Sequence, residues 1–137
     1  MSRNQTNTIE AIENDFWDNS EYPTTLVRRC HELMKKNLDL FEIEDYRILI
    51  GQNIALEILM PHALKILKEN FFAEGDCYEG DLLNAVLKSD KNYWNEHVEL
   101  KNEMIKLMEK NIEDLQNLDS LLQIDKHILE ILELFKA

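Results

Sequence analysis

The sequence predicts an all-α fold: a compact, single-domain bundle of about six to eight helices that ends in a C-terminal helical hairpin. Three observations lead to this prediction. The 137 residues include only 3 Gly and 2 Pro, although 45% of them are hydrophobic. Apolar residues recur at spacings of three and four, which is typical of helices, and no stretch alternates as a strand would. This length suits one domain, which we expect to span residues 1–137.

The N-terminal part is expected to contain two helices separated by a loop. Residues 8–15 form a short amphipathic segment, and residues 16–23 are aromatic, acidic and rich in turn formers. Thr24 or Thr25 can cap the next helix, because a threonine hydroxyl accepts a backbone N–H of the first turn. Lysines and an asparagine at residues 35–37 are typical of its C-terminal end.

Residues 43–70 are the most apolar part of the chain, and we expect them to be central and buried. Residues 51–53 look like an interruption, with a second helix beginning near Asn53. Pro61 removes a backbone donor and clashes with the preceding turn, so it predicts a kink or a helix boundary.

Residues 71–80 read as a second loop, because they contain two glycines and several acids. Asp81 is the expected N-cap of a short helix over residues 82–87. Asp90 or its neighbour Ser89 begins the last stretch.

From Trp94 to Leu115 the apolar residues follow a near-heptad stripe, which predicts one continuous helix. Residues 116–120 are polar and turn-like, and the apolar pattern resumes over residues 121–135. We therefore predict a helical hairpin rather than a single long rod.

Composition limits the functions that the chain can have. The formal net charge is −12, which argues against direct nucleic-acid binding and against an anionic membrane surface. Residues 1–15 contain no apolar signal core, and the longest apolar run is too short for a bilayer. Cys30 and Cys77 are too few for a disulfide scaffold. We therefore expect a cytoplasmic protein with free thiols.

The sequence contains no enzyme or metal-site signature. No histidine follows a glutamate in a Glu-x-x-His arrangement, and HExxH is absent. Cys30 lies on an apolar stripe and is expected to fill the core. Cys77 lies among acids, which disfavour a thiolate, and we expect it to be partly buried. We therefore predict no enzymatic activity, no cofactor and no metal.

Three stretches are acidic and contain no base: residues 10–21, 39–45 and 74–81. One interpretation is a solvated surface that keeps the protein soluble. The other is a negative face that docks on a basic partner. Aromatic residues beside the acids, such as Trp17 and Tyr78, favour docking because aromatics are common interface anchors.

The middle of the chain resembles the immunity proteins of bacterial contact-dependent growth inhibition (CDI) systems. The resemblance covers roughly residues 16–107, and it finds no counterpart in the acidic C-terminal extension over about residues 110–137. The matching residues are Glu44, Asp45, Arg47, Ile50, Gly51, Gln52, Asn53, Leu56, Glu57, Pro61, Leu64, Ala73, Glu74, Gly75, Asp76, Tyr78, Gly80, Asp81, Leu82 and Leu83.

The resemblance implies a non-enzymatic role: binding a cognate toxin C-terminal domain in the cytoplasm and neutralising it. Many such toxins are nucleases with basic substrate-binding faces, so the acidic surface would cover the active site or the cleft where phosphates bind. The implied partner is a protein, with no direct nucleic acid and no membrane, and the chain is expected to be a monomer or a weak dimer. The alternative is an acidic helical adaptor or oligomerisation protein, suggested by the near-heptad stripes.

Two groups of residues carry the predicted site. The first group consists of acids and aromatics near the two loops, which are the candidates for toxin contact. The second group matches the family pattern and is expected to be structural: turn glycines with positive φ, a cap, and amides that tie helices together. The toxin-contact candidates are Asp15, Trp17, Asp18, Glu74, Asp76, Tyr78 and Glu79. The structural candidates are Gly51, Gln52, Asn53, Pro61, Gly75, Gly80 and Asp81.

Overall fold

A computed structural model describes residues 7–14, 24–117, 133 and 135. Side chains are described through Asn111 and at Glu133 and Phe135. This part of the chain contains seven α-helices, one 3-10 turn and no strand, which confirms the predicted all-α class. The helices are α1 (Ile9–Glu13), α2 (Thr25–Met34), α3 (Ile43–Gly51), α4 (Leu56–Glu69), α5 (Asp81–Leu87), α6 (Lys91–Glu96) and α7 (Val98–Asn117), and the 3-10 turn is Leu38–Leu40.

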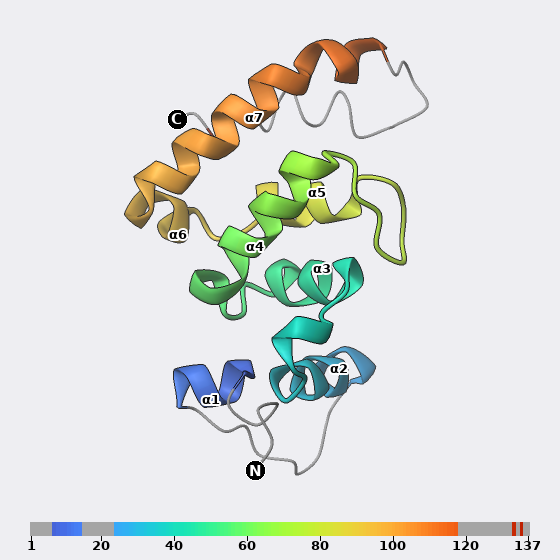
Figure 1. Cartoon of the computed structure of the whole chain (residues 1–137), viewed down its shortest axis with the longest axis vertical. Helices are drawn as coiled ribbons and strands as arrows, with labels where there is room; N and C mark the ends of the chain where they lie inside the picture. Colours follow the sequence, from blue (N-terminus) through green and yellow to red (C-terminus); the bar gives the residue numbers. More distant parts are fainter. Residues whose placement is uncertain (1–6, 15–23, 118–132, 134, 136–137) are drawn as a thin grey trace.

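The helices stack along the long axis of the molecule (Figure 1). Helices α1 and α2 form one end, α3, α4 and α5 form the middle, and α6 and α7 form the other end. Helix α3 packs against α5, α4 and α2, while α7 packs on α6 and α4. One continuous apolar core runs through these layers. Fully buried core residues include Leu33, Leu49, Leu59, Leu82 and Met104.

The first two helices begin where the sequence predicts. The Thr8 hydroxyl accepts the backbone N–H of Ala11 at 3.2 Å, and the Thr24 hydroxyl accepts that of Val27 at 3.1 Å. Each side chain satisfies a donor that has no partner within its helix. Helix α2 ends at Met34, one residue before the lysines expected at its C-terminus.

Two acids of the acidic stretch 39–45, Glu44 and Asp45, form ion pairs inside the fold. Asp45 is fully buried, and its carboxylate accepts hydrogen bonds from Arg29 at 3.0 Å, Lys36 at 2.6 Å and the backbone N–H of Glu42 at 2.9 Å. A buried carboxylate is tolerated because charged donors replace its water. The negative charge of Asp45 therefore joins α2 to α3 and does not contribute to an acidic surface.

The predicted interruption after α3 is confirmed, but α4 begins at Leu56 rather than near Asn53. Asn53 and Ala55 adopt left-handed backbone conformations, with φ of 58° and 54°. The Asn53 side chain accepts the backbone N–H of Asp90 at 2.8 Å. This bond ties the α3–α4 junction to the start of α6, as expected for an amide that joins helices.

Pro61 does not mark a helix boundary, because α4 continues through it to Glu69. The side chain of Pro61 is exposed, and so is that of Glu57, whose carbonyl loses its usual backbone donor. Water can hydrate that carbonyl on the exposed face, while Leu59 and Ala63 remain fully buried on the other face. The prediction of a boundary at Pro61 is therefore wrong.

The helix predicted to continue from Trp94 is broken at His97 into α6 and α7. The Asp90 side chain caps α6 by accepting the backbone N–H of Asn92 at 3.0 Å. At the break, the His97 Nδ1 lies 2.7 Å from the carbonyl oxygen of Tyr93. This change of direction leaves Val98 56% exposed, although the near-heptad stripe had placed it on an apolar face.

Phe135 packs against the beginning of the last two helices. Its ring lies 4.9 Å from that of Trp94, and the Lys101 amine lies 5.8 Å from the Phe135 ring centre. Phe135 thus lies near the start of α7, a helix about 30 Å long. The predicted turn at residues 116–120 falls largely outside the described residues.

Candidate functional site

The loop between α4 and α5, residues 70–80, is held in place by one buried carboxylate. Asp81 is 3% exposed. Its side chain accepts the backbone N–H of Gly75 at 2.7 Å, of Cys77 at 3.0 Å and of Tyr78 at 3.3 Å. Three backbone N–H groups of the loop are therefore held by a single side chain at the start of α5.

A second carboxylate, on α3, completes the support. Glu44 accepts the backbone N–H of Asp76 at 2.8 Å. Arg47, one turn further along α3, forms a two-point pair with Glu44, and its Nε also lies 3.7 Å from the Asp81 carboxylate. Paired Arg–carboxylate geometry of this kind is among the stronger polar contacts in proteins. Arg47 thus contacts both of the carboxylates that bind the loop.

The titration behaviour of this cluster follows from its contacts. The hydrogen bond from Arg47 lowers the pKa of Glu44, and the backbone N–H of Asp76 adds to that effect, while partial burial opposes it. The same pairing raises the pKa of Arg47 above its usual range. The Glu44–Arg47 pair is therefore charged near neutral pH, where Glu44 accepts the backbone N–H of Asp76.

Two of the predicted turn glycines serve different purposes. Gly80 precedes α5 with φ of 88°, a left-handed conformation that suits glycine. Gly75 does not have a positive φ. A Cβ at Gly75 would instead lie 2.6 Å from the Glu44 carboxylate and 3.2 Å from the Cα of Glu44. Gly75 is therefore needed for the close approach of the loop to α3.

The predicted capping role of Asp81 is displaced by one residue. Helix α5 begins at Asp81 itself, and Gly80 occupies the N-cap position. The Asp81 carboxylate points back to the loop rather than to the first turn of its helix. The prediction of Asp81 as N-cap is therefore wrong, and its carboxylate binds the loop instead.

The four toxin-contact candidates of this loop all lie on its exposed side. Glu74, Asp76, Tyr78 and Glu79 are exposed, and Tyr78 is 45% exposed. Within the described part of the chain, none of the three acids takes part in an ion pair. Cys77 is also exposed, in contrast to the partial burial expected for it.

The Tyr78 ring is fixed at its polar end. The Asn84 side-chain amide, one turn into α5, donates a 2.7 Å hydrogen bond to the Tyr78 hydroxyl. The ring therefore lies over the start of α5 with limited freedom. An ordered, half-exposed aromatic beside unpaired acids has the composition of an interface anchor. We call residues 74–79, with their three unpaired acids and Tyr78, the acidic loop.

The remaining predicted residues do not join the acidic loop. Asp15, Trp17 and Asp18 lie outside the described residues. Of the other structural candidates, Gly51, Gln52 and Asn53 are exposed at the α3–α4 junction, and Pro61 is exposed on α4. The site thus consists of residues that are close in sequence, together with Glu44 and Arg47 from α3.

Glu44 and Arg47 were not among the predicted site residues, although both belong to the family-like pattern. Their spacing of three on a helix indicated an ion pair. No local signal indicated that this pair lies against a loop some thirty residues further on. Another feature that was missed is a lysine cluster where α4 meets α7, lined by Lys68, Lys106 and Lys110.

The described residues offer neither a metal site nor a membrane-spanning helix. No group of three or more His, Cys, Asp or Glu residues there is arranged to hold a metal ion. No helix in this part of the chain has the length and apolar character needed to cross a membrane.

The fold and the site together define a small helical protein that displays a rigid acidic loop, an arrangement suited to protein binding. The sequence profile of the family described as CDI immunity proteins matches residues 11–104. This match covers more than half of the chain, so the chain belongs to the CDI immunity proteins and is a toxin-neutralising immunity protein. Its family implies a cognate CDI toxin as partner and a non-catalytic mode of inhibition.

The family match confirms the resemblance proposed from the sequence, with nearly the same boundaries. No curated protein and no solved structure matches the chain significantly.

Proposed function

We propose that this protein neutralises its toxin in the cytoplasm by covering a basic substrate-binding surface with the acidic loop, and that the toxin is a nuclease that acts on RNA. The observation that carries the proposal is the orientation of the loop. Asp81 and Glu44 bind its backbone from behind, so Glu74, Asp76 and Glu79 are left facing solvent.

The negative charge of the loop favours binding to a nuclease. A surface that binds RNA phosphates must be basic, and unpaired carboxylates compete for the same positions. The rest of the protein strengthens the attraction, since its formal net charge is −12. Such complementarity mainly raises the association rate. The same charge keeps the protein itself away from nucleic acid and from anionic membranes.

The rigidity of the loop favours tight binding. Ordering a flexible segment on binding costs free energy, and a preorganised segment avoids most of that cost. The backbone N–H groups of residues 75–78 are already bonded to the two carboxylates. Tyr78 supplies apolar area at the centre of the charged residues, where desolvated anchors contribute most to affinity.

The proposal is tested by neutralising the acidic loop. The triple variant Glu74→Gln, Asp76→Asn, Glu79→Gln removes three negative charges and leaves the supporting carboxylates intact. A matched control removes the same three charge types elsewhere: Asp39→Asn, Glu96→Gln and Glu99→Gln, all exposed. Binding to the toxin domain encoded beside this gene is measured by calorimetry, and protection is measured by co-expression in growing cells.

We expect the loop variant to bind at least tenfold more weakly, since several close charge pairs are lost, and to protect cells poorly. The control should bind nearly as the wild type does. Equal weakening of both variants would indicate a nonspecific effect of net charge and would contradict a role for the loop. Failure of the wild type to bind the toxin domain would contradict the proposal as a whole.

The adaptor alternative makes a different prediction. It requires self-association through the near-heptad stripes that run from Trp94 into the C-terminal hairpin, whereas the proposed inhibitor is a monomer or a weak dimer. Trp94 and Met108, from the described part of these stripes, are buried in the core of the same chain. Light scattering of the full chain and of a chain ending at Lys110 distinguishes the two. If the protein is an adaptor, truncation dissociates the oligomer, so the measured mass falls by more than the mass of the removed residues.

A further inference from the structure

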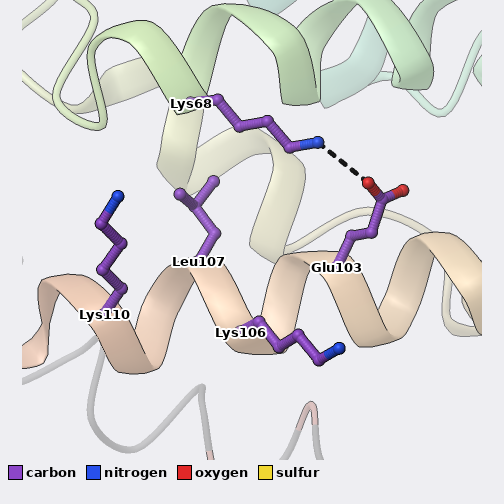
Figure 2. A pocket seen from close by; sticks show the side chains of 5 residues that line it. All are labelled: Lys68, Glu103, Lys106, Leu107 and Lys110. Atoms are coloured by element: carbon purple, nitrogen blue, oxygen red, sulfur yellow. Dashed lines mark hydrogen bonds and ion pairs between the residues drawn. The ribbon is translucent and has the colours of Figure 1, made fainter.

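A shallow groove of about 490 Å³ lies where the end of α4 meets the middle of α7. Figure 2 shows the side chains that line it: Lys68 from α4, and Glu103, Lys106, Leu107 and Lys110 from α7. We call this feature the lysine groove. Leu107, which is 9% exposed, supplies a small apolar surface. Lys110 extends beside Leu107, whereas Lys106 extends away from it along α7 (Figure 2).

The charges in the lysine groove are only partly compensated. Lys68 pairs with Glu103 at 2.9 Å. Among the residues that the structure describes, Lys106 and Lys110 have no ion-pair partner. Three lysines and one glutamate give the groove a formal charge of about +2, in a chain whose total is −12. The groove is therefore a local positive site with an apolar centre.

The lysine groove lies at the end of α4 from which the chain leaves for the acidic loop. Lys68 is the second-last residue of α4, which ends at Glu69. Figure 1 shows this end of α4 beneath α7, and the loop that leaves it turns away from α7 toward α3. A toxin domain that covers both features would meet a positive groove as well as a negative surface.

We propose that the lysine groove receives an acidic segment of the same toxin domain, with carboxylates on the lysines and an apolar side chain against Leu107. This inference rests on the proposed function. A surface of mixed sign selects partners more strictly than a uniformly acidic one, because a wrong partner places like charges together. The loop attracts basic domains in general, and the groove selects the one whose acidic segment lies at the right distance.

Charge favours this occupant over two others. Nucleic acid would be repelled by the net charge of the chain. A second copy of the chain would bring another −12 to the contact, which opposes self-association.

The decisive variant is Lys106→Glu with Lys110→Glu, which reverses the two unpaired charges. Both side chains are exposed, so we expect an unchanged melting temperature. The matched control is Lys88→Glu with Lys91→Glu, which makes the same change at two exposed lysines outside the groove. Affinity for the toxin domain should fall about tenfold or more for the groove variant and much less for the control.

Zero-length carbodiimide cross-linking identifies the occupant, because it joins amines only to carboxylates in direct contact. We expect cross-links from Lys106 or Lys110 to acidic residues of the toxin domain, located by mass spectrometry. Cross-links only between two copies of this chain would overturn the inference, as would a protein that binds a short RNA through these lysines.

The outcomes separate the inference from the proposed function. Toxin binding by the wild type with equal binding by the groove variant overturns the groove alone. Absence of toxin binding by the wild type overturns both. Loss of binding by the groove variant, with toxin cross-links and a normal control, supports both.

Discussion

The backbone N–H of Gly75 donates a 2.7 Å hydrogen bond to the buried carboxylate of Asp81. The bond spans six residues of the chain, and it is the shortest of the three that Asp81 accepts from the loop. Through this bond, Asp81 at the start of α5 fixes the position of the exposed acids of the loop. The immunity protein thus separates the carboxylates that hold the loop from those that face solvent.

Replacing Asp81 by Asn should loosen the loop. One side-chain oxygen remains, but the amide nitrogen that replaces the other faces backbone donors and cannot accept from them. We expect a loss of about 2 kcal/mol in the free energy of unfolding, since buried bonds to a charged group are broken. Urea denaturation measures the loss. The exposed Asp39→Asn is the control and should be nearly neutral.

Gly75→Ala should be destabilising by about 1–3 kcal/mol, the usual range for forcing atoms into a filled site. Its new Cβ would press on the Cα of Glu44, which cannot move aside as a flexible side-chain end can. Gly51→Ala is the matched control, because nothing lies within 4 Å of its Cβ and the site is helical. That control should be neutral or slightly stabilising. Equal melting temperatures for both variants would contradict the close approach.

Stability should fall in acid partly through Glu44. Its pKa in the folded protein is lowered from the ordinary value of 4.5, chiefly by Arg47. Because the folded-state pKa is lowered, ionised Glu44 stabilises the fold at pH values above its pKa in the unfolded chain. This stabilisation is lost as the pH falls through the folded-state pKa. Glu44→Gln should therefore flatten the pH dependence of unfolding below about pH 4.5, while lowering stability at pH 7. An unchanged slope would exclude Glu44 as a contributor.

The two cysteines should react very differently. Cys77 is exposed in the acidic loop, whereas Cys30 is buried and burial raises its pKa. We expect a maleimide to label one thiol, Cys77, in the native protein and both thiols in urea. Bound toxin domain should slow the labelling of Cys77 if the acidic loop is the interface. Labelling at the same rate in the complex would place the toxin elsewhere.

Phe135→Ala should test the contact between the chain end and α6. The substitution removes a buried ring that packs on Trp94 at 4.9 Å. Truncating a buried aromatic costs about 3–5 kcal/mol, and we expect a loss toward the lower end because the contact is near the chain terminus. Trp94 fluorescence should also shift to the red as water reaches the ring. Unchanged fluorescence and stability would contradict the contact.

Features that depend on neighbouring residues were predictable from the sequence. Thr24 caps its helix as expected, and the last stretch begins at Ser89 and Asp90, because a cap uses donors two or three residues away. The acidic loop was recognised from its glycines and acids, and Tyr78 is exposed on it as predicted. The break at His97 was missed, because the spacing of Trp94 and later apolar residues fits a continuous helix equally well.

Features that depend on distant residues were not predictable. Asp45 belongs to an acidic stretch that looked like a surface, yet Arg29 and Lys36 bury it between α2 and α3. Lys68 and Lys106 are 38 positions apart in sequence and line one groove only because α4 packs on α7.

The sequence by itself determined the all-α class, the family and the acidity of the loop, since helical periodicity, motif residues and charge are local properties of the chain. The tertiary structure decided which acids face outward. Glu74 and Asp81 are both acids of one short stretch, but packing α5 on α3 buries Asp81 beside Arg47 and leaves Glu74 exposed. A buried carboxylate must find donors within the fold, whereas an exposed one is hydrated and free to meet a partner.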